Sequence, residues 1–108
     1  GWGFILSLQF TKNTQTGSPY YVYTVFRAIS GGSTTNLGAS TNNQFGQEAA
    51  GADISDNTYR RFHLEFYDAP STTSATTYTL QFKKTSGSNS LYAHSGGRNE
   101  FIAEEIAQ

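Results

Sequence analysis

Apolar and polar side chains alternate along several segments of this chain, most clearly in the last third. From residue 76 to residue 84 the alternating side chains are, in order, Tyr78, Thr79, Leu80, Gln81, Phe82 and Lys83. A period of two sends successive side chains to opposite faces of an extended backbone. We therefore expect a strand here, with one buried face and one solvated face.

Short polar segments interrupt the rest of the last third. Thr85–Ser90 and Ser95–Asn99 have the composition of turns, and the residues between them, Leu91–His94, are suited to a short strand. Phe101–Ile106 follows as a final strand. Strand, turn, strand, turn, strand at such close spacing predicts an antiparallel meander, because no helix fits between the pieces.

The first two thirds predict further strands. Phe4–Phe10 alternates before a polar turn at Thr11–Ser18, and Tyr20–Ile29 and Tyr59–Tyr67 are long and rich in aromatic residues. Short strands are expected at Asn36–Ala39 and Gln44–Gln47. With six to eight strands and no helix in 108 residues, the sequence predicts one all-β domain, an antiparallel sandwich or jelly roll spanning residues 1–108.

Composition excludes several functional classes. Seven basic and eight acidic residues give a net charge of −1, without the basic stripe that nucleic-acid binding requires. No apolar run approaches the ~20 residues of a membrane-spanning helix, so we expect no membrane insertion. Cysteine is absent, so neither disulfides nor thiolate-bound metals can hold the fold. We expect no cofactor.

The sequence begins at Gly1 with strand-like residues and contains no methionine. We therefore expect the chain to be the C-terminal module of a longer polypeptide, with Gln108 at or near the end.

The segment Tyr20–Ile29 predicts self-association. Val22 and Phe26 would lie on one face of this strand, and the opposite face carries Tyr21, Tyr23 and Val25. A monomeric sandwich exposes one face of each sheet to water, and exposed apolar patches usually mark interfaces. We therefore expect a homo-oligomer in which Tyr21, Tyr23 and Val25 form the contact. The alternative is that long loops cover this face.

No group of residues forms a convincing catalytic or metal site. A triad of Asp68, His94 and Ser95 can be written, but a chain rich in serine offers such combinations by chance. Glu104 and Glu105 are adjacent and point to opposite faces of a strand, so they cannot share a substrate. We expect neither a catalytic residue nor a metal ligand. A small esterase that depends on His94 remains a minor alternative.

Two loop regions have the composition of recognition surfaces. Tyrosine, asparagine and serine supply flat faces and adaptable hydrogen bonds to glycans and proteins. The predicted ligand-binding residues are Asn36, Asn42 and Asn43 in the first loop region and Thr72 and Thr73 in the second. Ordinary loop chemistry is the alternative for each of them.

The last third also resembles a known family. The segments that carry the resemblance are Thr77–Lys83, Ser86–Gly87, Leu91–Tyr92, the terminal Glu105–Ile106 and the loop Tyr67–Pro70. In these segments the chain resembles the small C-terminal β-domains of bacteriophage structural proteins, particularly those of marine phages. The resemblance implies a tumour-necrosis-factor-like jelly roll that assembles as a homotrimer, and it supplies no catalytic residue.

The expected function is therefore that of a non-enzymatic virion structural protein. We expect a trimeric domain at the tip of a tail fibre or capsid fibre, in contact with other virion proteins and with a glycan or protein on the host surface. Two alternatives remain. One is a capsid decoration protein that binds capsid subunits, and the other is a carbohydrate-binding module of a secreted hydrolase.

Overall fold

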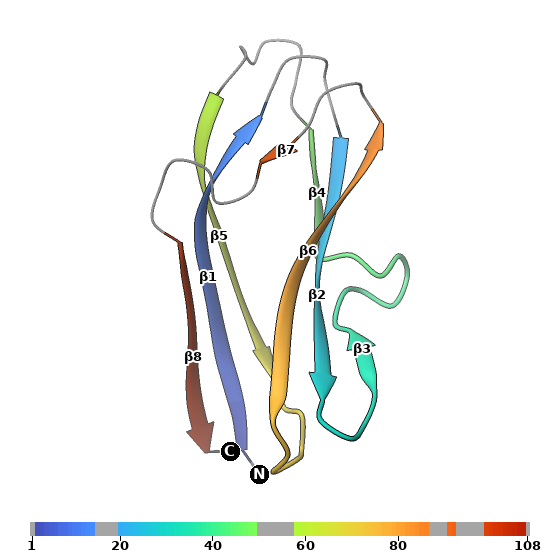
Figure 1. Cartoon of the computed structure of the whole chain (residues 1–108), viewed down its shortest axis with the longest axis vertical. Coiled ribbons are helices and arrows are strands. Elements are labelled where there is room, and N and C mark those ends of the chain that lie inside the picture. Colours follow the sequence, from blue (N-terminus) through green and yellow to red (C-terminus); the bar gives the residue numbers. More distant parts are fainter. Residues whose placement is uncertain (1, 15–19, 50–57, 87–90, 93–98, 108) are drawn as a thin grey trace.

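The protein is a sandwich of two antiparallel sheets (Figure 1). The computed structural model describes residues 2–14, 20–49, 58–86, 91–92 and 99–107, and the side chains of residues 2–10, 22–46, 62–83 and 99–107. Its strands are β1 (Trp2–Thr14), β2 (Tyr20–Ile29), β3 (Thr34–Asn36), β4 (Gly46–Ala49), β5 (Thr58–Asp68), β6 (Thr76–Ser86), β7 (Leu91–Tyr92) and β8 (Glu100–Ala107). No helix occurs in the described residues, so the predicted all-β fold is confirmed.

The two sheets are built on the same plan. In the first sheet, β5 pairs with β1 along residues 4–14, so β8 and β7 must share the opposite edge of β1. In the second sheet, β6 pairs with β2 along residues 20–29, and β3 and β4 share the opposite edge. Each sheet is therefore a long central strand with one long neighbour and one interrupted neighbour.

The predicted meander of the last third is wrong. β6 belongs to the second sheet, whereas β7 and β8 both pair with β1 in the first sheet. The chain crosses from one sheet to the other after β6 because the free edge of β1 accepts the final strands. A short polar segment between two strands indicates a reversal of the chain, but it does not reveal whether the strands pair with each other.

Several strand boundaries also differ from the prediction. β1 continues to Thr14, so residues 11–14 are paired with β5 and are not a turn. The short strands lie at Thr34–Asn36 and Gly46–Ala49, shifted from the predicted positions. The last residues of β1 are polar, but they remain in the strand because they pair with the long strand β5.

The core lies between the inner faces that the alternation predicted. Leu6 and Val25 are fully buried, and Leu8, Phe10 and Phe62 are nearly so. Rings of the two sheets meet edge to face at centroid distances of 5.0 Å for Tyr23–Phe62 and 5.7 Å for Phe10–Phe82, and Phe10 and Phe62 of the first sheet lie 4.8 Å apart. Edge-to-face ring packing of this kind adds to the burial of apolar area.

This core corrects the predicted oligomer interface. Val25 has no exposed area, and the Tyr23 ring packs against Phe62 of the opposite sheet. Val25 therefore cannot form an intersubunit contact, and the half-buried Tyr23 ring is used in packing within one chain. The side chain of Tyr21 lies outside those described. The outer face of β2 carries Val22, Thr24 and Phe26, and none of these three is classed as exposed.

A buried polar cluster joins the sheets at the end of β5. The Arg27 guanidinium of β2 donates to Asp68 at 2.7 Å, and the Tyr78 hydroxyl of β6 donates to the other carboxylate oxygen at 2.6 Å. Burial of the ring, and then the hydrogen bond to Asp68, raise the pKa of Tyr78 well above its usual range. Asp68 therefore has a structural role here. His94 and Ser95, the other two residues of the triad considered from the sequence, lie outside the described residues.

Replacing Asp68 tests this cluster. Asp68→Ala would leave the mostly buried Arg27 without its counter-charge, which we expect to lower the free energy of unfolding by about 3 kcal/mol. The measurement is urea unfolding followed by tryptophan fluorescence or circular dichroism. Glu65→Ala is the matched control, because the Glu65 carboxylate is exposed and lies 3.8 Å from an exposed His63; its effect should stay within about 0.5 kcal/mol. Equal losses for both variants would contradict the role of Asp68.

The raised pKa of Tyr78 predicts a pH dependence. The unfolded chain would release this proton near pH 10 while the folded chain retains it, so stability is complete below that pH and falls as the pH rises above it. We expect the stability difference between the wild type and Tyr78→Phe to shrink above about pH 10. Urea unfolding of both proteins at several alkaline pH values measures it. A constant difference would contradict the prediction.

Candidate functional site

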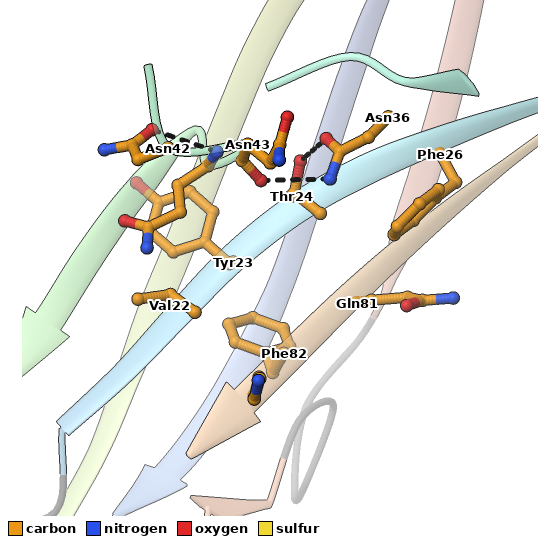
Figure 2. Close-up of a pocket in the computed structure, with 11 residues that line it drawn as sticks. Val22, Tyr23, Thr24, Phe26, Asn36, Asn42, Asn43, Gln81 and Phe82 are labelled. Atoms are coloured by element: carbon orange, nitrogen blue, oxygen red, sulfur yellow. Dashed lines mark hydrogen bonds between the residues drawn. The ribbon is translucent and has the colours of Figure 1, made fainter. Parts of the chain in front are cut away.

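A hollow of about 300 Å³, lined by apolar groups and side-chain amides, lies on the outer face of the second sheet (Figure 2). Side chains of β2 and β6 and the loop between β3 and β4 surround it. Its lining residues are Val22, Tyr23, Thr24, Phe26, Asn36, Asn42, Asn43, Gln44, Gln81, Phe82 and Lys83. The volume is at the lower end of the range of small-ligand sites.

The loop between β3 and β4 leaves one edge of β2 and returns to the same edge. The amide of Leu37 donates to the carbonyl of Val25, and the amide of Phe45 donates to the carbonyl of Tyr23. Both ends of the loop are thus tied to β2, only two residues apart. The intervening residues have to leave the sheet and return, which places their side chains above the outer face.

Local geometry explains the residue types at the neck of this loop. A Cβ atom on Gly38 would lie 2.5 Å from the backbone nitrogen of Gln44, so only glycine allows this approach. Asn43 has a φ of 59°, a left-handed conformation that asparagine tolerates better than most residues. The amides of Asn42 and Asn43 both donate to the carbonyl of Ala39, which closes the tip.

Asn36 holds the loop in place. Its Oδ1 accepts hydrogen bonds from the Thr24 hydroxyl at 2.6 Å and from the Gly38 amide at 2.8 Å, and its Nδ2 donates to the Asn43 carbonyl at 3.0 Å. Most of the hydrogen-bonding capacity of this side chain is used within the protein. Asn36 therefore supports the loop, and its binding of a ligand stays a prediction.

Other amides around the hollow remain available. The Asn42 side chain accepts one hydrogen bond from the Gln44 amide at 3.2 Å, which leaves its NH₂ group free. Asn43 and Gln81 are exposed, and within the described part of the chain their side chains have no hydrogen-bond partner. Figure 2 shows the asparagines on one side of β2 and Gln81 on the other, with Val22 and Phe26 between them as apolar floor.

The hollow is almost free of charge. Lys83 is the one charged side chain in its lining, and the remaining polar side chains are amides and the hydroxyl-bearing Tyr23 and Thr24. Amide groups can donate and accept hydrogen bonds, and the exposed ring edges and aliphatic groups offer apolar contact. This combination suits a neutral ligand with several hydroxyl groups.

The two predicted recognition loops do not form one surface. Thr72 and Thr73 border a separate depression with Trp2, Ala103 and Glu105 at the far end of β6. The Thr72 hydroxyl there accepts a hydrogen bond from the Ser74 amide, as is usual in short turns. Prediction from loop composition missed Gln81, Val22 and Phe26. The alternation of β6 could have placed Gln81 on the outer face, but both faces of β2 are apolar and alternation does not place Val22 and Phe26.

No alternative reactive centre is found in the described residues. His63 is exposed on the outer face of β5, and its nearest acidic partner is the equally exposed Glu65. Within the same residues, no group of three or more histidine, aspartate or glutamate side chains is placed to hold a metal ion. Nor does the described part of the chain contain a helix long and apolar enough to cross a membrane.

Comparison with protein-family models, with curated proteins and with solved structures gives no match to this chain. The assignment of function therefore depends on the site itself and on the resemblance found in the sequence.

Replacing Asn36 tests the organisation of the site. Asn36→Ala removes three hydrogen bonds and leaves the largely buried Thr24 hydroxyl without its partner, so we expect a loss of about 2 kcal/mol in unfolding free energy. Hydrogen exchange at the amides of Gly38 and Gln44 should become faster. Asn42→Ala is the control and should cost less than about 1 kcal/mol, since it removes one exposed hydrogen bond. Unchanged exchange in Asn36→Ala would contradict the anchoring role.

Proposed function

We propose that this chain is a non-enzymatic virion module, the trimeric tip domain of a tail fibre or capsid fibre, which binds a neutral glycan on the host surface. The observation that carries the proposal is the amide-lined hollow on the outer face of the second sheet. The virion setting comes from the resemblance of the last third to bacteriophage C-terminal β-domains, with which the observed sandwich is compatible.

The chemistry of the hollow supports a glycan over other ligands. Sugars offer hydroxyl groups that both donate and accept, which matches the free amides of Asn42, Asn43 and Gln81. Phosphorylated or strongly acidic ligands would require a cluster of cations, and Lys83 is the one cation that borders the hollow. The loop that carries the asparagines is held by its own hydrogen bonds, so little ordering is required on binding.

Exposed apolar side chains support the proposal that the chain is part of an assembly. Four large hydrophobic side chains, from Trp2, Tyr67, Phe101 and Ile102, are each close to half exposed or more. Exposed apolar surface of this extent usually marks an interface. The proposed trimer would cover it, which fits a fibre tip that presents several weak glycan sites at once.

Glycan binding is tested with the folded domain. A glycan array should identify neutral oligosaccharides, and titration calorimetry should then measure dissociation constants for the ones that bind. We expect Gln81→Ala and Asn43→Gly each to weaken binding about tenfold, because each removes a free amide while Gly tolerates the left-handed conformation of residue 43.

Two controls separate the hollow from the other loop. Thr72→Ala and Thr73→Ala alter the depression at the far end of β6 and should leave glycan affinity unchanged. Loss of binding in these variants, with no effect of Gln81→Ala, would move the site to that depression. If no glycan binds, the receptor role fails. Labelled antibodies on intact particles would then decide whether the domain decorates the capsid instead.

A further inference from the structure

The depression at the far end of β6 has a volume of about 1050 Å³, which is room enough for a small organic molecule. It lies where β6 begins and β8 ends, at the lower end of the sandwich in Figure 1. Aromatic rings, the hydroxyl groups of the loop between β5 and β6, and one carboxylate line it, and no basic residue borders it. Its chemistry therefore differs from that of the amide-lined hollow.

Small side chains on β8 create this depression. Ala103 is paired with Leu6 and Ala107 with Trp2, so both alanines lie on the inner face of the first sheet. In a sandwich the side chains of the two inner faces fill the space of about 10 Å between the sheets. Alanine extends only a short way into that space, so it stays open above β8.

Trp2 lies on the same inner face but is not packed there. Alternation from the buried Leu6 places Phe4 and Trp2 on the inner side of β1. The Trp2 side chain is nevertheless 61% exposed, and it stacks on no other ring of the described residues. Among the aromatic side chains, tryptophan attracts a cation to its ring face most strongly. The depression thus presents an accessible indole ring.

A single carboxylate accompanies this ring. Glu105 is paired with Phe4, so it is a diagonal neighbour of Trp2 at a separation of about 7 Å, and one ligand group can contact both. Glu105 is exposed, and within the described part of the chain its carboxylate has no ion pair and accepts no hydrogen bond. Its charge is therefore available to a ligand.

The opposite wall is neutral and preorganised. The Tyr78 hydroxyl donates to Asp68, whose charge is balanced by Arg27, so Tyr78 offers a ligand its ring. In the loop, the Ser74 amide donates to the Thr72 hydroxyl at 3.1 Å, and the Thr76 hydroxyl donates to the Ser74 carbonyl at 3.1 Å. Because the loop is already held by these bonds, ligand binding requires little further ordering.

We infer that this depression binds an organic ammonium group, which lies against the Trp2 ring with Glu105 as its counter-charge. The ring attracts the cation, and the carboxylate supplies the opposite charge. The exposed loop hydroxyls can bond a hydroxyl group carried beside the cation. A phosphate next to the ammonium group is disfavoured, because no cation lines the depression.

The inference goes beyond the proposed function and does not depend on it. No residue lines both the hollow and the depression, and the hollow is assigned to neutral sugars. The other large exposed apolar side chains, Tyr67, Phe101 and Ile102, lie outside the depression, so an assembly that covers them can leave it open. Failure of ammonium binding would leave the glycan proposal standing, and failure of glycan binding would leave this one standing.

Choline and its uncharged carbon isostere, dimethylbutanol, test the role of charge. Trp2 is the one tryptophan of the chain, so its fluorescence reports directly on ligands that reach the depression. We expect choline to change the emission with a dissociation constant on the order of 1 mM. Dimethylbutanol has the same shape and should bind about tenfold more weakly. Equal affinities for the two, or no binding of choline, would overturn the inference.

Two adjacent carboxylates provide a matched pair of variants. Glu105→Gln should weaken choline binding about fivefold and leave the affinity for dimethylbutanol unchanged. Glu104→Gln changes the net charge equally, but Glu104 is exposed on the outer face of β8, where it is paired with Ile5. Its effect on choline affinity should be less than about twofold. Equal effects of the two variants would contradict the assignment of Glu105 as the counter-charge.

Trp2→Leu tests the ring. This variant should lose choline binding, which is measured by ligand-detected nuclear magnetic resonance because the fluorescent reporter is gone. If it does not fold, as judged by circular dichroism, Trp2→Phe replaces it and should bind choline more weakly than the wild type does. Phosphocholine should bind the wild type more weakly than choline does. Choline binding that survives the loss of the indole, or tighter binding of phosphocholine, would overturn the inference.

Discussion

Four aromatic rings, from Phe10, Tyr23, Phe62 and Phe82, hold the two sheets against each other. They come from β1, β2, β5 and β6, the four long strands, and their centroids lie 4.8 to 6.0 Å apart. Because side chains alternate along a strand, this contact determines which face of every long strand is inner and which is outer. The Arg27–Asp68–Tyr78 cluster extends the same inner faces at the other end of the sandwich.

The aromatic contact also determines where functional surfaces can lie. With Tyr23 and Phe82 turned inward, their strand neighbours Val22, Thr24 and Gln81 must face outward, beneath the loop between β3 and β4. The position of the hollow is therefore a consequence of this packing arrangement.

The inner faces of the long strands were predictable because each is encoded by local alternation. Leu6, Leu8, Phe62, Leu80 and Phe82 all lie where a period of two places them. The prediction of which face of β2 is buried was wrong because both of its faces are apolar, and alternation alone cannot distinguish them. The prediction of a meander in the last third was wrong for a related reason. Which free edge a strand joins depends on residues far away in the chain, and β8 found its partner in β1, almost a hundred residues earlier.

The candidate site shows the same division. Composition indicated the asparagines of the first loop, and three of them do border one hollow. Their roles differ, however, because Asn36 lies within reach of the Thr24 hydroxyl and the Asn43 carbonyl, contacts that exist only once β3 is paired with β2. Gln81 belongs to a strand far along the chain and reaches the site only through the pairing of β2 with β6.

By itself, the sequence determined that this protein is an all-β sandwich, which strands are long and which side chains of β1, β5 and β6 are inner. Those properties follow from the two-residue repeat of an extended backbone, which any local stretch of sequence carries. Only the tertiary structure decided which face of β2 is buried, which edge β8 joins, and which apolar residues stay exposed. Those outcomes depend on long-range strand pairing and on how the two sheets pack, and no local pattern specifies them.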